Sequence, residues 1–117
     1  DDAGITRDER RACVQGHVAT RESALIAGWT TFNTAMTAAY TARKTALNDA
    51  WGKTDATERK NAVKAAWNAF KAAKKVAVRG WNDTRKNAWK TFRTNVKACK
   101  AGSETTVEAA GEISDGL

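Results

Sequence analysis

Bulky apolar residues recur along the chain at spacings of three, four and eleven positions. The eleven-residue spacing links Trp29, Tyr40 and Trp51 in the first half and Phe70, Trp81 and Phe92 in the second. Steps of three and four place side chains on one face of an α-helix, whereas a strand would need strict alternation. A spacing of eleven corresponds to about 3.67 residues per turn, which keeps the stripe nearly straight and disfavours a leucine zipper. The pattern therefore predicts long helices.

The composition favours the same fold class. The chain of 117 residues contains 24 alanines and no proline. Alanine is the strongest helix former, and an internal proline would break or kink a helix. We therefore expect an all-α protein. No apolar run approaches the roughly 20 residues that a membrane helix needs, so we expect no membrane span.

A helix stop followed by a helix start lies between the two apolar stripes. Gly52 can adopt the left-handed conformation that ends many helices. Asp55, with Glu58 three residues later, resembles a capping box that begins the next helix. The sequence predicts a single helical domain over residues 1–117. Its expected parts are a first helix at about 6–51, a turn at 52–55, a second helix at about 56–101 and an acidic tail at 102–117.

Folding the chain back at this turn pairs positions whose numbers have a nearly constant sum. The pairs that sum to 110 include Trp29 with Trp81 and Tyr40 with Phe70. Cys13 and Cys99 sum to 112, within one helical turn of the same register. The predicted fold is thus a long antiparallel hairpin whose open end is closed by a Cys13–Cys99 disulfide. An even number of cysteines in a small chain fits a disulfide in an oxidising compartment.

Gly28 and Gly80 leave an alternative open, because each directly precedes a tryptophan. An interior glycine destabilises a helix by about 1 kcal/mol relative to alanine. These positions predict a kink, a break that gives a compact four-helix bundle, or a close approach that makes room for Trp29 or Trp81. The hairpin is preferred, and the four-helix bundle is the alternative.

Aromatic residues exceed what the seam between two helices can bury. They are Trp29, Phe32, Tyr40, Trp51, Trp67, Phe70, Trp81, Trp89 and Phe92. The pattern W-x-x-F occurs three times and puts two large rings on adjacent turns of one helix face. Exposed apolar surface generally marks an interface, so these residues are predicted to serve the core or self-association.

Charge is unevenly distributed along the chain. Residues 1–42 carry four basic and five acidic groups, residues 43–100 carry sixteen and four, and residues 101–117 carry none and four. The predicted basic face of the second helix contains Lys64, Lys71, Lys74, Lys75, Arg85, Lys86, Lys90, Arg93 and Lys97. Acidic ends and a basic flank would steer one subunit onto the next. Val107, Ile113 and Leu117 of the tail are expected to dock on another surface, such as that of a neighbouring subunit.

Motifs for catalysis or cofactor binding are not found in the sequence. His17 is the only histidine, and there is no nucleophile elbow or glycine-rich phosphate loop. Cys13 and His17 lie one helical turn apart, but a structural metal site needs four ligands. We therefore expect no catalytic residues, no cofactor and no metal.

These features predict a non-enzymatic structural subunit that is secreted to the outside of the cell or to its surface. A chain that begins at Asp1 fits the mature product of a cleaved precursor. A subunit contact that does not close into a ring propagates as a fibre, so the expected assembly is an extracellular, pilus-like filament or a surface sheath. The alternative is a basic helical protein that binds nucleic acid or an anionic cell-surface polymer.

In composition and in its repeated W-x-x-F, the chain resembles Ala/Lys/Arg/Thr-rich secreted helical proteins predicted in uncultured candidate-phylum bacteria. The resemblance implies an exported helical protein, and it assigns no functional residue.

Overall fold

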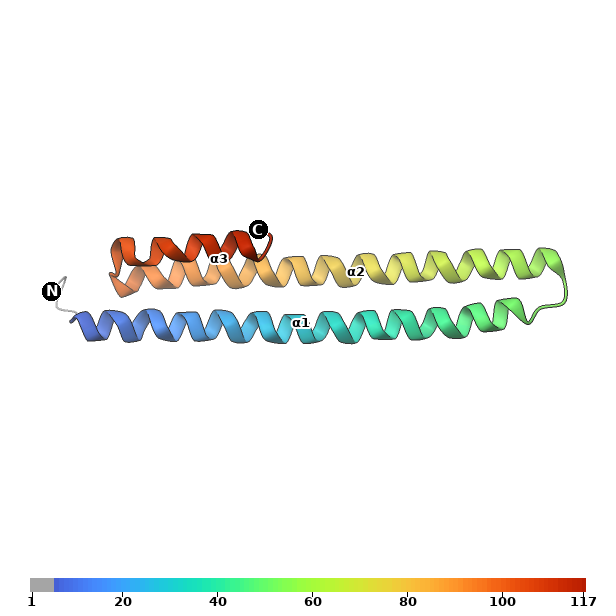
Figure 1. The fold of residues 1–117 in the computed structure, drawn as a ribbon, viewed down its shortest axis with the longest axis horizontal. Helices are drawn as coiled ribbons and strands as arrows, with labels where there is room; N and C mark the ends of the chain where they lie inside the picture. Colours follow the sequence, from blue (N-terminus) through green and yellow to red (C-terminus); the bar gives the residue numbers. More distant parts are fainter. Residues whose placement is uncertain (1–5) are drawn as a thin grey trace. The chain divides into compact units, whose positions relative to one another are not determined.

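The computed structural model describes residues 6–117, which are almost entirely helical (Figure 1). Its elements are α1 (Arg7–Trp51), α2 (Ala56–Val96), the short 3₁₀ helices η1 (Lys97–Cys99) and η2 (Gly102–Val107), and α3 (Glu108–Ser114). No strand occurs between residues 6 and 117. The predicted all-α hairpin, with its turn at 52–55, is confirmed. Over the same residues, no helix combines the length and apolar character of a membrane span.

Side-chain caps begin both long helices. At α1 the backbone N–H of Glu9 donates to Thr6 Oγ1 over 3.0 Å, and the N–H of Thr6 donates to Glu9 Oε2 over 3.2 Å. At α2 the N–H of Glu58 donates to Asp55 Oδ2 over 2.9 Å, as the sequence predicts. Each bond satisfies an N–H that has no partner within its helix. The acidic residues 1 and 2 lie outside the described part of the chain.

The turn between α1 and α2 does not use a left-handed glycine. Within the described chain, positive φ values occur at Lys100, Gly102 and Gly116, so the left-handed conformation predicted for Gly52 is wrong. Instead, the N–H of Gly52 donates to the carbonyl of Asp49 over 3.2 Å. This hydrogen bond reaches back three residues rather than the four of an α-helix, so it tightens the last turn of α1 and ends the helix.

The two interior glycines do not break their helices. α1 is continuous through Gly28 and α2 is continuous through Gly80, so the four-helix alternative is wrong. A Cβ atom added at Gly80 would meet no heavy atom within 4 Å. Gly80 therefore does not make room for Trp29, and the close-approach interpretation is wrong for this position.

The described residues group into two compact units. Unit 1 contains residues 6–28 and 82–117, and unit 2 contains residues 29–81. Unit 1 includes the disulfide and α3, and unit 2 includes the turn of the hairpin. The single domain expected from the sequence stays a prediction, and the two units are described separately.

The C-terminal segment of unit 1 is more ordered than the sequence indicates. α2 ends at Val96 rather than near residue 101. Lys100 and Gly102 have φ values of 60° and 59°, which change the direction of the chain between η1 and η2. η2 and α3 then run back along the last part of α2 (Figure 1). The acidic tail is thus a third helical segment of unit 1.

Candidate functional site

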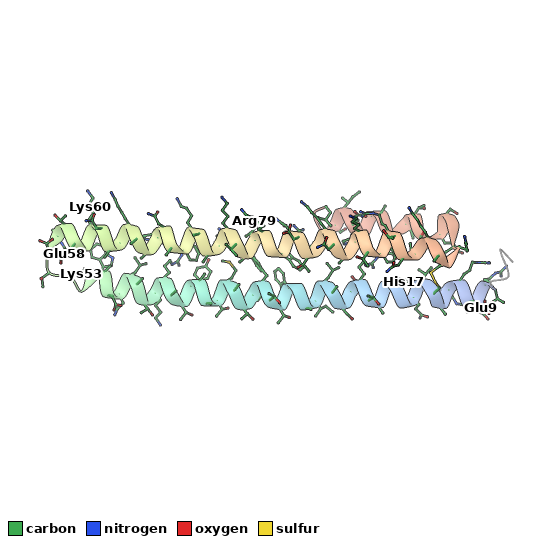
Figure 2. All side chains as sticks on the ribbon, turned by 180° about the vertical axis from the view of Figure 1, so that it is seen from behind. Glu9, His17, Lys53, Glu58, Lys60 and Arg79 are labelled. Atoms are coloured by element: carbon green, nitrogen blue, oxygen red, sulfur yellow. A yellow bond between two sulfur atoms is a disulfide. The ribbon has the colours of Figure 1, made fainter. Side chains whose placement is uncertain are left out.

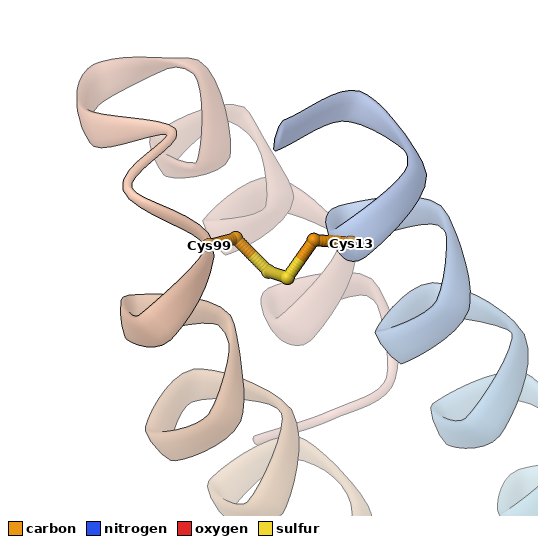
Figure 3. Close-up of a disulfide and its surroundings, with 2 residues drawn as sticks. All are labelled: Cys13 and Cys99. Atoms are coloured by element: carbon orange, nitrogen blue, oxygen red, sulfur yellow. A yellow bond between two sulfur atoms is a disulfide. The ribbon is translucent and has the colours of Figure 1, made fainter. Parts of the chain in front are cut away.

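A disulfide joins α1 to the end of the α2 region in unit 1, as predicted. Cys13 comes from α1 and Cys99 from η1, and their Cα atoms lie 5.5 Å apart (Figure 3). Cys99 is fully buried beside Trp89, Phe92 and Val96. The partly buried apolar residues that pack against this core are Cys13, Val14, Val18 and Leu117. The disulfide is therefore part of the core of unit 1.

Arg21 is the buried charged residue of this core, with only 6% of its surface exposed. Its guanidinium carbon lies 4.2 Å from the ring centre of Trp89 and 4.4 Å from that of Phe92. Its Nη1 atom donates to Glu108 Oε2 over 2.7 Å. A buried guanidinium requires such a partner, because an unpaired charge in this position would lose its hydration without compensation. We call Arg21, Trp89 and Phe92 the Arg21 cluster.

α3 and Asp115, the residue that follows it, cover the Arg21 cluster with carboxylates and one close backbone contact. Besides the Glu108 bond, the indole N–H of Trp89 donates to Asp115 Oδ2 over 2.6 Å. Glu112 forms an ion pair with Arg93 of α2. A Cβ atom added at Gly111 would lie 3.2 Å from Trp89 Cη2, so glycine lets the α3 backbone approach the indole. Trp89 is only 2% exposed as a result of this packing.

The predicted docking residues of the tail have different environments. Leu117 packs against the core of unit 1. Val107 and Ile113 are 74% and 72% exposed, so the chain itself does not bury them. Neither side chain docks within unit 1, because the contacts of this segment with α2 are made by carboxylates. Docking on a neighbouring subunit stays a prediction.

Aromatic pairs across the hairpin of unit 2 follow the register of the sequence. The ring centres of Trp29 and Trp81 lie 5.4 Å apart. Those of Tyr40 and Phe70 lie 5.0 Å apart. Two further ring pairs lie along single helices, Trp29 with Phe32 in α1 and Trp67 with Phe70 in α2. The constant-sum rule thus identified the residues that meet between α1 and α2.

A second arginine lies among these rings in unit 2. The guanidinium carbon of Arg43 lies 4.6 Å from the ring centre of Tyr40, 4.7 Å from that of Trp67 and 4.4 Å from that of Phe70. We call these four residues the Arg43 cluster. Cation–π contacts of this kind contribute about 0.5–2 kcal/mol each, depending on how far they are desolvated.

Large aromatic side chains of unit 2 remain exposed. Those that expose about half of their surface or more are Trp29, Tyr40, Trp51 and Trp67, which we call the aromatic face. Trp51 is 67% exposed, and its described cation–π partner is Arg59, 6.0 Å away. Phe32, Phe70 and Trp81 are partly buried between these residues. Exposed apolar side chains at this density mark a candidate interface.

The lysines and the arginines of the predicted basic face have different environments. Its seven lysines are Lys64, Lys71, Lys74 and Lys75 in unit 2, and Lys86, Lys90 and Lys97 in unit 1, and all are exposed. Figure 2 shows charged side chains, Lys60 among them, on the side of α2 away from α1. Arg85 and Arg93 instead contact the C-terminal segment, because Arg85 donates to the carbonyl of Asp115, directly after α3, and Arg93 pairs with Glu112 of α3. The acidic tail thus meets basic residues of its own chain.

The remaining polar groups of residues 6–117 that lie close together include one cluster of potential metal ligands and one groove with a histidine. Cys13, His17 and Cys99 come together in unit 1, but both sulfur atoms are used in the disulfide. His17 also lines a groove of about 290 Å³, together with Thr84, Asn87 and Asn95. The described lining of this groove holds no carboxylate that could orient the imidazole.

Comparisons with protein families, curated proteins and solved structures found no match for this chain.

Sequence reasoning missed the two arginines and the role of α3. A usable signal was present, because Arg21 and Arg43 fall on the same helix face as the apolar stripe of α1. An arginine within an aromatic stripe indicates a guanidinium stacked on rings, and such a group commonly takes a carboxylate partner. Glu108 was counted only as part of an acidic tail.

Proposed function

We propose that the chain is a non-enzymatic structural subunit that binds other protein chains through the aromatic face of unit 2. Self-assembly into an extracellular filament or surface sheath is the specific form of this function. The observation that carries the proposal is the half-exposed set of rings in unit 2. Tryptophan and tyrosine at this exposure are the residue types that anchor protein interfaces.

The difference in exposure between Trp89 and Trp67 supports this proposal. Trp89 in unit 1 is 2% exposed, whereas Trp67 in unit 2 is 47% exposed. Both belong to a W-x-x-F pair and both contact an arginine. The disulfide supports an oxidising, extracellular location, because such bonds persist there and are rare in the cytosol.

The experiment measures the oligomeric state of the purified, oxidised protein by sedimentation velocity, with negative-stain microscopy at low and high salt. We expect concentration-dependent association, and we expect Trp51→Ala to weaken it because Trp51 is the most exposed ring of the aromatic face. Val76→Ala removes an equally exposed apolar side chain that does not belong to the aromatic face and serves as the control. A protein that stays monomeric under every condition would contradict self-assembly.

Polyanion binding is a second candidate, favoured by the seven exposed lysines of the basic face. Among residues 6–117, the ion pairs are made by arginines and leave these lysines without a carboxylate partner. Binding to duplex DNA or heparin should then weaken steeply as salt rises, because each phosphate or sulfate contact releases counterions. Binding that is absent at low salt would eliminate this candidate.

A further inference from the structure

The Arg43 cluster repeats the Arg21 cluster within the same hairpin register. Arg43 lies 22 residues after Arg21 in α1, and Trp67 and Phe70 lie 22 residues before Trp89 and Phe92 in α2. Opposite shifts of equal length keep two antiparallel helices in register. Twenty-two residues are two eleven-residue repeats, so the side chains return to the same helix face. The arginine-to-ring distances agree, at 4.2 and 4.4 Å in unit 1 and 4.7 and 4.4 Å in unit 2.

The groups that hold α3 in unit 1 are also repeated. α3 binds through Glu108 to Arg21, through Asp115 to the Trp89 indole and through Glu112 to Arg93. The positions in unit 2 that match these three partners are Arg43, Trp67 and Lys71. A cation, an indole donor and a second cation are therefore present at the same spacing. The match is not complete, since Val63 stands where unit 1 has Arg85.

The two clusters differ in their burial and in whether a third helix packs over them. In unit 1 the arginine is buried, Glu108 of α3 pairs with it at 2.7 Å in addition to a longer contact of 3.4 Å with Glu22, and Trp89 is 2% exposed. In unit 2 Arg43 is only partly buried and Trp67 is 47% exposed. No carboxylate among residues 6–117 forms an ion pair with Arg43. The Arg43 cluster thus has counterparts of the groups that bind α3 in unit 1, but no helix of residues 6–117 pairs a carboxylate with it.

We propose that Arg43, Trp67 and Lys71 form a docking site for an acidic helix of a different protein. This inference rests on the proposed role of the aromatic face and names the chemistry of its partner. The partner helix carries carboxylates at the spacing of Glu108, Glu112 and Asp115, with a small residue like Gly111 above Trp67. The α3 of this chain does not serve, because residues 6–117 contain one such helix and two clusters. If α3 moved to the Arg43 cluster of a second copy, it would leave the Arg21 cluster of its own copy uncovered.

The test uses a peptide of residues 104–117 in which a hydrocarbon staple replaces the exposed side chains at positions 106 and 110 and leaves every carboxylate free. Circular dichroism first shows that this peptide is helical. The peptide is titrated into the full-length oxidised protein, and the indole N–H signals are followed by nuclear magnetic resonance. We expect a saturable shift of the Trp67 signal and an unchanged Trp89 signal. A helical peptide that leaves the Trp67 signal unmoved overturns the proposal, and so does one that moves Trp89 by exchanging with α3.

Two pairs of variants show whether the site is specific. Lys71→Glu should weaken binding about tenfold or more, because it replaces a charge-assisted contact with repulsion. Lys44→Glu reverses another exposed charge in unit 2 and should have a much smaller effect. In the peptide, Glu108→Gln should weaken binding and Glu104→Gln should not. Equal losses for Lys71→Glu and Lys44→Glu would show diffuse charge attraction and reject the site.

The result is separable from the test of the proposed function. A protein that assembles but does not bind the peptide keeps the proposed self-assembly and loses the acidic-helix site. A monomeric protein whose Trp67 binds the peptide loses self-assembly and keeps this site.

Discussion

Arg21 shows how one side chain connects three segments of unit 1. It belongs to α1, stacks on two rings of α2 and pairs with Glu108 of α3. Its side chain is almost completely desolvated, so the geometry of all three contacts is fixed by packing. A buried charge of this kind is more costly to leave unpaired than to pair.

Glu108→Gln should therefore lower the free energy of unfolding by about 1–3 kcal/mol, because a neutral amide replaces the charged partner of a buried guanidinium. Urea denaturation followed by circular dichroism measures the change. Glu104→Gln removes an exposed carboxylate from the same segment and should change stability little. A double-mutant cycle with Arg21→Met that shows no coupling would contradict the importance of the pair.

Gly16 and Gly80 are interior helix positions that the surrounding structure leaves open. A Cβ atom at either glycine would meet nothing within 4 Å. Gly16→Ala and Gly80→Ala should each stabilise the protein by about 0.5–1 kcal/mol, since alanine loses less backbone entropy in a helix. Thermal or urea unfolding measures this gain, and a destabilised variant would indicate a contact that the structure does not contain. Gly111→Ala serves as the contrast, because its Cβ meets Trp89.

At the level of elements, α3 depends on the close approach of Gly111 to Trp89. Gly111→Leu should push α3 away from α2, increase acrylamide quenching of tryptophan fluorescence and lower stability by about 1–3 kcal/mol. Ala110→Leu adds the same side chain at the neighbouring exposed position and should do neither. Equal effects of the two substitutions would mean that α3 is not held through its Gly111 side.

The elements differ in how far the sequence could predict them. α1, α2 and the turn follow from apolar periodicity and from Asp55, both of which are local signals. α3 was missed because its inward contacts are made by Glu108, Glu112 and Asp115, so it lacks an apolar stripe. Polar contacts with distant residues leave no periodic signal, and an acidic segment that binds its own chain looks like a solvated tail.

For the whole molecule, the pairing register of α1 and α2 was predictable, but which aromatic side chains are buried and which are exposed was not. The constant sum of paired positions placed Trp29 against Trp81 and Cys13 against Cys99, because one turn fixes the phase of both stripes. The burial of each tryptophan depends on the position of α3, which covers Trp89, whereas Trp67 remains exposed. The candidate site in unit 2 could therefore be recognised only by comparing the two clusters in three dimensions.

The disulfide acts on the stability of the whole molecule through the unfolded state. It joins residues separated by 86 positions in the sequence. Closing a loop of this length lowers the entropy of the unfolded chain, which stabilises the folded protein by about 4–5 kcal/mol. Cys13→Ala together with Cys99→Ala should lower the free energy of unfolding by most of this amount, and added reductant should then have no further effect. If the double variant melts at the same temperature as the oxidised protein, α1 and α2 are held together by their rings and by the Arg21 cluster alone.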